Sequence, residues 1–454
     1  MTSRRLAAPS ALSRRALRAR PWPAIAWFLL CLPHFGSPLG GLYSPSAASV
    51  YLVAWTGLVC CTSWLWLLRL RLTDETGLRW RILVFLLYGL LSVAFGYWEL
   101  SKTDQQTLSL TTGLVSYLAI AEQDLFHVVL AVLTFEVVRL SRVPPIKLMQ
   151  WWLVGMAIAV GLHAFSYVAS SDPMVRRAGT FTEGNLGGLY YALSFFIALQ
   201  YRRFGRRRRG MAFALLALSG TILSGSTAAI LVLAMAVSVT YVLRARSAFA
   251  RIRRTLLIVG ALVLVGTLMY GTGADFGIGE KLFEADVTEN SFSRIDRLTS
   301  IDIAIDLFLD SPWIGHGLQS YGFLVNDRLY GPLLDVYDGS FRRIPNNIYA
   351  ELAAETGIVG LLLFGTFVFS LVRRIASSRG DKDKHLLGAM LTVLCYWMAF
   401  PTYSVLFVWA FFGLALSILR TGPAPVAKRR HATRRTPRPN YLPNDSCIPA
   451  PSVL

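Results

Sequence analysis

The chain has 454 residues, of which 54% are hydrophobic and only 16% are charged, against about 25% charged residues in an ordinary soluble domain. This composition excludes a soluble globular enzyme, because too few charged side chains remain to cover its surface. The formal net charge of +19 would fit a nucleic-acid-binding protein, but it also fits a membrane protein whose Lys and Arg residues gather in cytoplasmic loops.

Apolar runs along the chain predict an all-α, polytopic membrane protein with about 12 transmembrane helices, because a spanning helix needs roughly 17–25 mostly apolar residues. The predicted spans are 22–39, 48–68, 82–98, 124–140, 149–168, 186–200, 211–223, 227–243, 255–272, 357–372, 386–400 and 403–419. The small polar run 224–227 is expected to turn the chain between two short passes. The apolar segment 108–121 is expected to be interfacial or re-entrant, since a further span there would disturb the alternation of charge.

Twelve spans with both termini in the cytoplasm account for the charge. The segments then placed inside hold most of the 45 basic residues and few of the 26 acidic ones, as the positive-inside rule requires. The surplus therefore indicates orientation, and no nucleic-acid partner is expected. We predict a multi-pass protein of the bacterial inner (plasma) membrane.

The predicted organisation has five parts. They are a basic cytoplasmic arm (1–21), transmembrane helices one to nine (22–272), a large periplasmic loop with amphipathic helices (273–356), transmembrane helices ten to twelve (357–420) and a basic, disordered cytoplasmic tail (421–454). The active site is expected in the outer loops, because loops held by rigid helices commonly carry function.

The shorter outer loop reads DPMVRRAGTFTEGN (172–185), with Arg176 and Arg177 side by side and Asn185 opening the next span. Arginine suits phosphate because its planar fork donates two parallel hydrogen bonds. Binding of lipid head groups by these arginines is the alternative. Because the positive-inside rule disfavours arginine in a short outer loop, we favour a functional role.

In the long loop, Arg294 and Arg297 precede a run up to Asp310 whose apolar residues fit one face of a helix. Such an amphipathic helix can lie on the membrane surface. Pro312 is expected to end it, and Gly315-His316-Gly317 to form a flexible turn. For both arginines the alternative is a solvated face with nearby aspartates as partners.

The segment 342–364 follows, with a helix for which Asn346 or Asn347 is a good N-cap. For Glu351 and Glu355 a solvated helix face is the alternative to a functional role. Glu355 and Gly357 are expected to mark a break before the next span.

Two histidines lie near the outer loops. His316 is a candidate general base, since neutral imidazole serves this role near neutral pH. His163, near the outer end of the fifth span, is either a substrate-binding group or a buried histidine with a hydrogen-bonded partner. No metal-ligand spacing occurs in the sequence, so we expect no metal and no cofactor.

Three segments resemble the O-antigen ligase and repeat-unit polymerase superfamily. RRAGTFTEGN (176–185) is similar to the family's Arg-x-x-Gly-Thr-Phe-x-x-Pro-Asn, with Gly184 in place of Pro. RLTSIDIAIDLFLDSPWIGHG (297–317) is similar to its Arg-led helix ending in Pro-x-x-Gly-x-Gly. NNIYAELAAETGIVGLLLF (346–364) is similar to its His-Asn-x-Tyr-Leu run, with Asn346 where the family has the His. Thr227 stands where many members have Arg. The resemblance covers roughly residues 150–370.

The resemblance implies a glycosyltransferase that takes an oligosaccharide from a polyprenyl-pyrophosphate donor to an acceptor, either another glycan unit or a lipid A core. Taking the motifs and the residues around them together, we predict four catalytic residues: Arg297, Arg176, Asn346 and, as the nearest spare base, His316. We predict seven substrate-binding residues: Arg177, Arg294, Asn185, Asn347, Tyr349, Glu351 (a second candidate base) and His163. Polymerase is slightly favoured over ligase, because the family's His is replaced. Other polysaccharide assembly proteins are candidate partners.

Two other classes of function stay open. Twelve spans also suit a transporter or flippase for lipid-linked glycan, whose site would lie at mid-membrane. A non-catalytic member of a polysaccharide assembly complex is the second alternative, because Asn346 replaces the family's base.

Overall fold

The structure is a computed structural model that describes residues 77–102, 113–140, 143–169, 181, 184–245, 247–272, 289–325, 345–377, 384–400 and 405–421. This part of the chain is helical and contains no strand, so the all-α class is confirmed for it. The predicted spans 22–39 and 48–68, the two terminal arms, and Arg176 and Arg177 lie outside the described residues, and the side chain of Arg294 is likewise not described.

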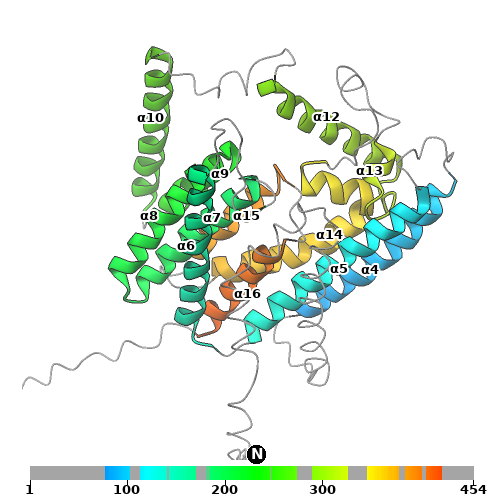
Figure 1. Cartoon of the computed structure of the whole chain (residues 1–454), viewed down its shortest axis with the longest axis horizontal. Helices are drawn as coiled ribbons and strands as arrows, with labels where there is room; N and C mark the ends of the chain where they lie inside the picture. The colour runs from blue at the N-terminus through cyan, green and yellow to red at the C-terminus, as the bar shows by residue number, and fades with distance from the viewer. Residues whose placement is uncertain are drawn as a thin grey trace, which may run out of the picture.

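Within the described ranges the helices follow one another along the chain (Figure 1). They are α4 (Leu78–Leu100), α5 (Gly113–Leu140), α6 (Pro145–Ala169), α7 (Gly184–Arg203), α8 (Arg207–Leu223), α9 (Thr227–Leu243), α10 (Ala248–Thr272), α12 (Glu289–Asp310), α13 (Tyr321–Leu324), α14 (Ile348–Ser377), α15 (Lys384–Tyr396) and α16 (Leu406–Thr421).

Each predicted span from 82–98 onward coincides with a helix. By length and composition, three of the described helices can cross a membrane: Trp80–Leu100, Pro145–Val168 and Ile348–Ser377. Three further apolar helices are shorter: Thr227–Leu243, Lys384–Tyr396 and Leu406–Leu419. The structure therefore supports a membrane protein, and the number of twelve spans stays a prediction.

One predicted boundary is wrong. From Gly113 onward the segment 108–121 is not a separate interfacial element but the first turns of α5, which runs unbroken to Leu140. No Gly or Pro follows Gly113 within the helix, so the polar residues near 122–124 lie inside it without interrupting it.

The core of the bundle is aromatic and is centred on α16, which is apolar around most of its circumference. Trp409 of this helix is 1% exposed and stacks on Phe367 of α14, with ring centroids 5.4 Å apart. A helix that is apolar all round is expected to be buried. This helix contacts α5, α6 and α14, and therefore joins the early and late parts of the chain.

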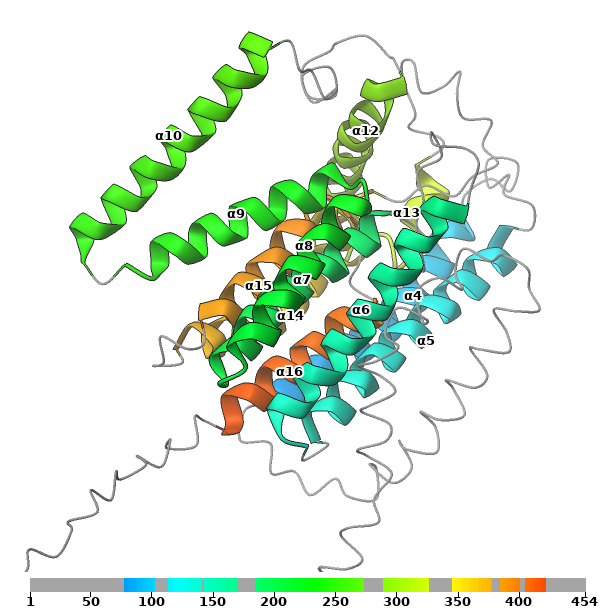
Figure 2. The same ribbon diagram turned by 60° about the vertical axis from the view of Figure 1, so that its left-hand side comes forward.

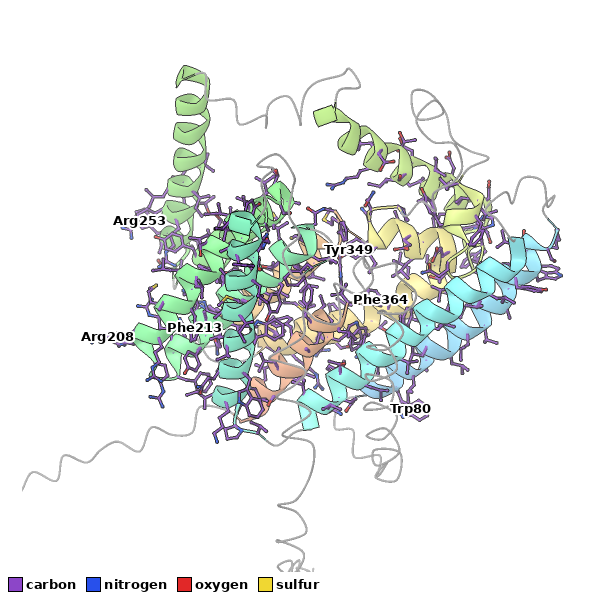
Figure 3. The ribbon with its side chains drawn as sticks, in the orientation of Figure 1. Trp80, Arg208, Phe213, Arg253, Tyr349 and Phe364 are labelled. Carbon is purple, nitrogen blue, oxygen red and sulfur yellow. The ribbon has the colours of Figure 1, made fainter. Side chains whose placement is uncertain are left out.

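The ends of the helices fall on two sides of the molecule. In Figure 2 the turn between α7 and α8, the beginning of α15 and the end of α16 lie at the lower left, whereas α12 and α13 lie at the top. The helix α10 lies at the edge, beside α9. The basic run 202–209 is thus on the side away from α12, as the predicted orientation requires. Figure 3 labels Arg208 and Arg253, whose side chains point away from the bundle.

Candidate functional site

Helix α14 is broken at Gly357, where φ is 60° and ψ is −165°. A break in a helix leaves backbone N–H and C=O groups without their usual partners. Here the segment 312–317, which we call the strap, supplies the partners. The amide of Ile358 donates to the carbonyl of Pro312 at 2.8 Å, and the amide of Gly317 donates to the carbonyl of Glu355 at 2.8 Å. The sequence predicted the break, and the structure confirms it.

Glycine is required on both sides of this contact. A Cβ on Gly315 would lie 2.4 Å from the backbone of Glu355, and a Cβ on Gly357 would lie 2.5 Å from the backbone of Trp313. Both glycines have positive φ angles, a region that other residues rarely enter. The turn at Gly315-His316-Gly317, expected to be flexible, is instead anchored on α14.

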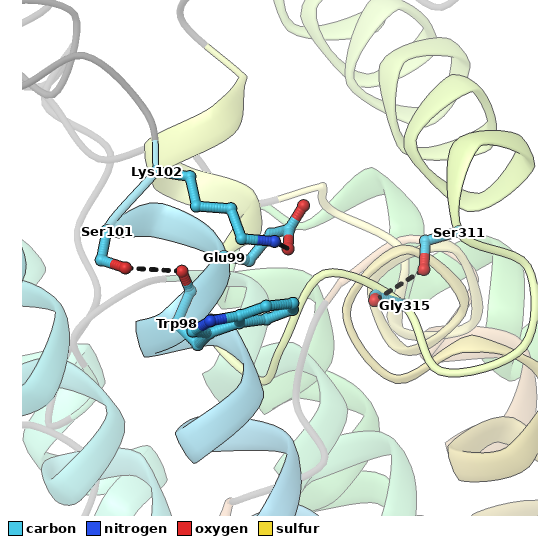
Figure 4. A network of polar contacts seen from close by, with 6 residues as sticks. All are labelled: Trp98, Glu99, Ser101, Lys102, Ser311 and Gly315. Carbon is cyan, nitrogen blue, oxygen red and sulfur yellow. Dashed lines mark hydrogen bonds and ion pairs between the residues drawn. The ribbon is translucent and has the colours of Figure 1, made fainter.

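Helix α4 covers the strap from the other side. Tyr88 donates its hydroxyl to the carbonyl of Thr356 at 2.8 Å, and the hydroxyl of Ser92 accepts the amide of Leu318 at 3.0 Å. Figure 4 shows the end of α4 beside the turn that Ser311 closes by donating to the carbonyl of Gly315 at 2.9 Å. At this end of α4 the Nζ of Lys102 lies 3.2 Å from the ring centroid of Trp98, which is a cation–π contact.

The predicted helix at Arg297–Asp310 is confirmed within α12, but its single apolar face is not. The buried face includes Ser300, Ile303, Ala304 and Leu307, and it packs on α14. Leu298 and Leu309 are 56% and 66% exposed. The helix therefore has two apolar sides, one against the protein and one exposed.

Arg297 lies on the α14 side of α12, because residues at i, i+3 and i+7 share a helix face and Ser300 and Ala304 are both buried. Its side chain is half-buried. Asp302 and Asp306 are exposed, so they lie away from this face. Half-burial weakens solvent screening, so the charge of Arg297 acts more strongly there than at an exposed position.

His316 is fixed between α12 and α14. Its amide donates to the carbonyl of Ala354 at 3.0 Å, and its Nε2 lies 2.9 Å from the carbonyl oxygen of Leu307. Since a carbonyl only accepts, Nε2 carries the proton, and a neutral ring then has Nδ1 as its accepting nitrogen. A base at this position would act through Nδ1.

Asn346 and Asn347 differ in their roles. The side chain of Asn347 accepts the amides of Tyr349 at 2.9 Å and Ala350 at 3.1 Å, so Asn347 is the N-cap of α14. Asn346 has a φ of 23°, in the left-handed region where Asn and His are both enriched. The same backbone position therefore tolerates either residue.

The start of α14 is attached to the end of α15. The amide of Ile348 donates to the carbonyl of Trp397 at 3.0 Å, and the Tyr349 hydroxyl donates to the carbonyl of Leu394 at 3.1 Å. Tyr349 thus has a positioning contact that the sequence did not indicate.

The alternative for Glu351 and Glu355, a solvated face of α14, is wrong. They are 3% and 1% exposed, because this face of α14 is covered by the strap and neighbouring helices. One carboxylate oxygen of Glu355 accepts the amide of Tyr321 at 3.3 Å, which ties α13 to α14. Buried carboxylates are found where partners hold them.

Asn185 joins the start of α7 to the turn between α8 and α9. Its side-chain oxygen accepts the Ser226 hydroxyl at 2.9 Å, and Ser226 also caps α9 by accepting the amide of Ala229. The Tyr396 hydroxyl donates to the carbonyl of Asn185. Gly225 has a φ of 60°, so the predicted turn at 224–227 is confirmed.

His163 is buried, as the alternative expected. Its Nδ1 lies 3.3 Å from the Tyr191 hydroxyl, and its ring stacks on Tyr167 with centroids 5.6 Å apart. Tyr167 in turn donates to the carbonyl of Leu223 at 2.8 Å, next to the α8–α9 turn.

Tyr396 and Trp397, at the end of α15, connect Asn185 to the start of α14. Tyr396 contacts Asn185, and Trp397 contacts the start of α14. The structure thereby brings Asn185 and residues 346–349 to one place, although they are more than 150 residues apart in sequence. Sequence reasoning missed Tyr396 and Trp397, because two aromatic residues at the end of an apolar run look like ordinary core. Among the described residues no group of three or more His, Cys, Asp or Glu could hold a metal ion.

Comparison with known families adds an independent finding. Residues 212–365 match the family model described as O-antigen ligase, over about a third of the chain. The matched segment includes the turn at 224–227, Arg297, the strap and the broken part of α14. The resemblance to the O-antigen ligase and polymerase superfamily is confirmed for this segment. A comparison with curated protein sequences gives no match.

Proposed function

We propose that the protein is a membrane glycosyltransferase that moves an oligosaccharide from polyprenyl pyrophosphate to an acceptor glycan at the periplasmic face. The observation that carries this proposal is the O-antigen ligase match over residues 212–365, which contain Arg297 and His316. We favour the polymerase reaction, in which the acceptor is another lipid-linked unit, over ligation to a lipid A core.

Arg297 is the proposed anion-stabilising group. The acceptor hydroxyl attacks the anomeric carbon, the bond from that carbon to the pyrophosphate oxygen breaks, and lipid pyrophosphate leaves. Negative charge grows on the leaving oxygen, and a guanidinium held on the inner face of α12 would stabilise it. Arg176, Arg177 and Arg294 are proposed to share this task from the outer loops.

His316 is the proposed base, with Nδ1 accepting the proton of the attacking hydroxyl. Asn346 cannot take that proton, because its amide has no basic nitrogen. It can hold a sugar hydroxyl, as can Asn185, Asn347 and Tyr349, while Glu351 is a second candidate base. A pyrophosphate leaving group needs little help from a strong base, so transfer remains feasible without the family's His.

The test is a deletion strain complemented with variants and examined for surface polysaccharide. A polymerase predicts single repeat units on the acceptor in the deletion strain, whereas a ligase predicts unattached lipid-linked polymer.

Arg297→Ala should reduce product at least about 100-fold, the usual effect of removing one group that stabilises developing charge. Asp306→Ala, on an exposed side of the same helix, is the control and should support normal chain length. Unchanged glycan in both Arg297→Ala and Asn346→Ala strains would refute the proposed site.

The transporter and the non-catalytic assembly member remain the alternatives. A transporter predicts lipid-linked precursors that accumulate on the cytoplasmic side in the deletion strain. A non-catalytic member predicts that Arg297→Ala and His316→Ala both complement fully, while deletion of the whole protein does not.

A further inference from the structure

The ends of α7 and α9 and the beginning of α15 lie on the side of the molecule away from α12 (Figure 2). Each of these ends carries basic residues. Arg244, which follows α9, places Nη2 2.7 Å from Nδ1 of His385 on α15. Lys384 donates to the carbonyl of Leu243 at 3.1 Å. These two contacts fix the position of two cationic groups relative to two helices, α9 and α15.

His385 lies at the centre of this group and is 5% exposed. It precedes the predicted span 386–400. Arginine can only donate, so the ring nitrogen facing Arg244 accepts and the ring is neutral. Burial, followed by the charges of Arg244, Arg203 and Arg202, lowers the pKa of His385 to about 2. Arg202 and Arg203 are in the last turn of α7, and α7 packs against α15.

We propose that Arg202, Arg203, Arg244 and Lys384 form a binding site for the phosphate of an anionic bilayer lipid on the predicted cytoplasmic side. Basic groups between the cytoplasmic ends of membrane helices are suited to anionic lipid head groups, and arginine binds phosphate with paired donors. The neutral ring of His385 positions Arg244 without adding to the charge. This site does not depend on the proposed transferase activity.

Two ordinary explanations compete with this site. Basic residues in the last turn favour a helix C-terminus through the helix dipole, and basic loops orient membrane proteins. The first explanation predicts a loss of stability that does not depend on the lipid. The second predicts that any arginine of this side can be exchanged with similar effect. The start of α8 provides the comparison, because Arg207, Arg208 and Arg209 belong to the same basic run and are in the first turn of α8. Arg202 and Arg203 are exposed too, but they end the helix that packs against α15.

The experiment uses the full chain in nanodiscs containing either zwitterionic lipid alone or zwitterionic lipid with phosphatidylglycerol. Retained lipid is counted by native mass spectrometry, and the apparent Tm is measured in both. The triple variant Arg202→Gln/Arg244→Gln/Lys384→Gln should lose at least about tenfold in retained anionic lipid, given roughly 1 kcal/mol for each basic residue near such a surface. It should also lose the rise in Tm that phosphatidylglycerol gives. The control triple Arg207→Gln/Arg208→Gln/Arg209→Gln should keep the retained anionic lipid and the rise in Tm that phosphatidylglycerol gives.

Equal losses in the two triples would refute the site and leave general electrostatic attraction. A drop in Tm that is the same in both lipid mixtures would likewise refute it, in favour of helix capping. If inorganic phosphate in zwitterionic nanodiscs gives the same stabilisation as phosphatidylglycerol, the site binds a soluble anion and the lipid assignment is wrong. Should the triple variant not fold, Lys384→Gln alone should reduce retained lipid about fivefold, and no reduction would contradict the proposal.

Discussion

Asn346 and Asn347 are adjacent amides, yet the structure gives them different tasks. Asn347 accepts two backbone amides at the start of α14, which stabilises the helix and leaves its side-chain oxygen occupied. Asn346 has the left-handed backbone and no capping role. The substrate-binding role proposed for Asn347 therefore competes with its structural one, whereas Asn346 is the stronger candidate to contact a sugar.

Replacement of Asn347 separates these two roles. Asn347→Ala should lower the free energy of unfolding by about 1 kcal/mol, because the cap is lost, and the apparent Tm of purified protein should fall. Asn347→Ser keeps a capping oxygen and should restore both Tm and activity. Restored Tm without restored activity would instead show that the Asn347 amide contacts substrate.

At the scale of elements, the break in α14 and the strap form one unit. Each supplies the hydrogen-bond partners that the other lacks, and their backbones approach so closely that a Cβ at either glycine would clash. The strap therefore holds α12, with Arg297, against α14. The position of Arg297 therefore depends on Gly315 and Gly357, which are distant from it in sequence.

Substitution of Gly357 tests this unit. Gly357→Ala should destabilise the protein by at least about 2 kcal/mol, from the left-handed φ angle and the clash with Trp313. Gly365→Ala in the same helix is the control, since nothing lies within 4 Å of its added Cβ, and it should be neutral or stabilise by up to about 1 kcal/mol. Equal Tm values for the two variants would contradict the role given to the strap.

The elements differ in how far the sequence predicted them. Apolar run length predicted the described helices that coincide with the expected spans, except for the start of α5. The residue types at Ser226, Pro312 and Gly357 predicted three helix ends, because capping and breaking are local effects. The short α13 was not predicted. The split of α12 into two apolar sides and the burial of Glu351 and Glu355 were not predictable, since they depend on which helix packs against which.

For the whole molecule, the candidate site depends on contacts between distant segments. The end of α15 joins Asn185 to the start of α14 through Tyr396 and Trp397, and neither aromatic residue carries a local signal. The resemblance identified Arg297, His316 and Asn346 as candidates, but only the structure shows that His316 is hydrogen-bonded through Nε2 and that Arg297 faces α14. Arg176 and Arg177 stay predictions.

The proposed glycosyltransferase activity is tested most directly by measuring transfer with the purified protein. Reconstituted into proteoliposomes with a polyprenyl-pyrophosphate-linked oligosaccharide, it should lengthen the glycan and release one lipid pyrophosphate for each unit added. Arg297→Ala should abolish both products, while Asp306→Ala should retain them. An oligosaccharide of unchanged length, together with lipid-linked material that crosses the bilayer, would contradict the proposed transferase and identify a transporter.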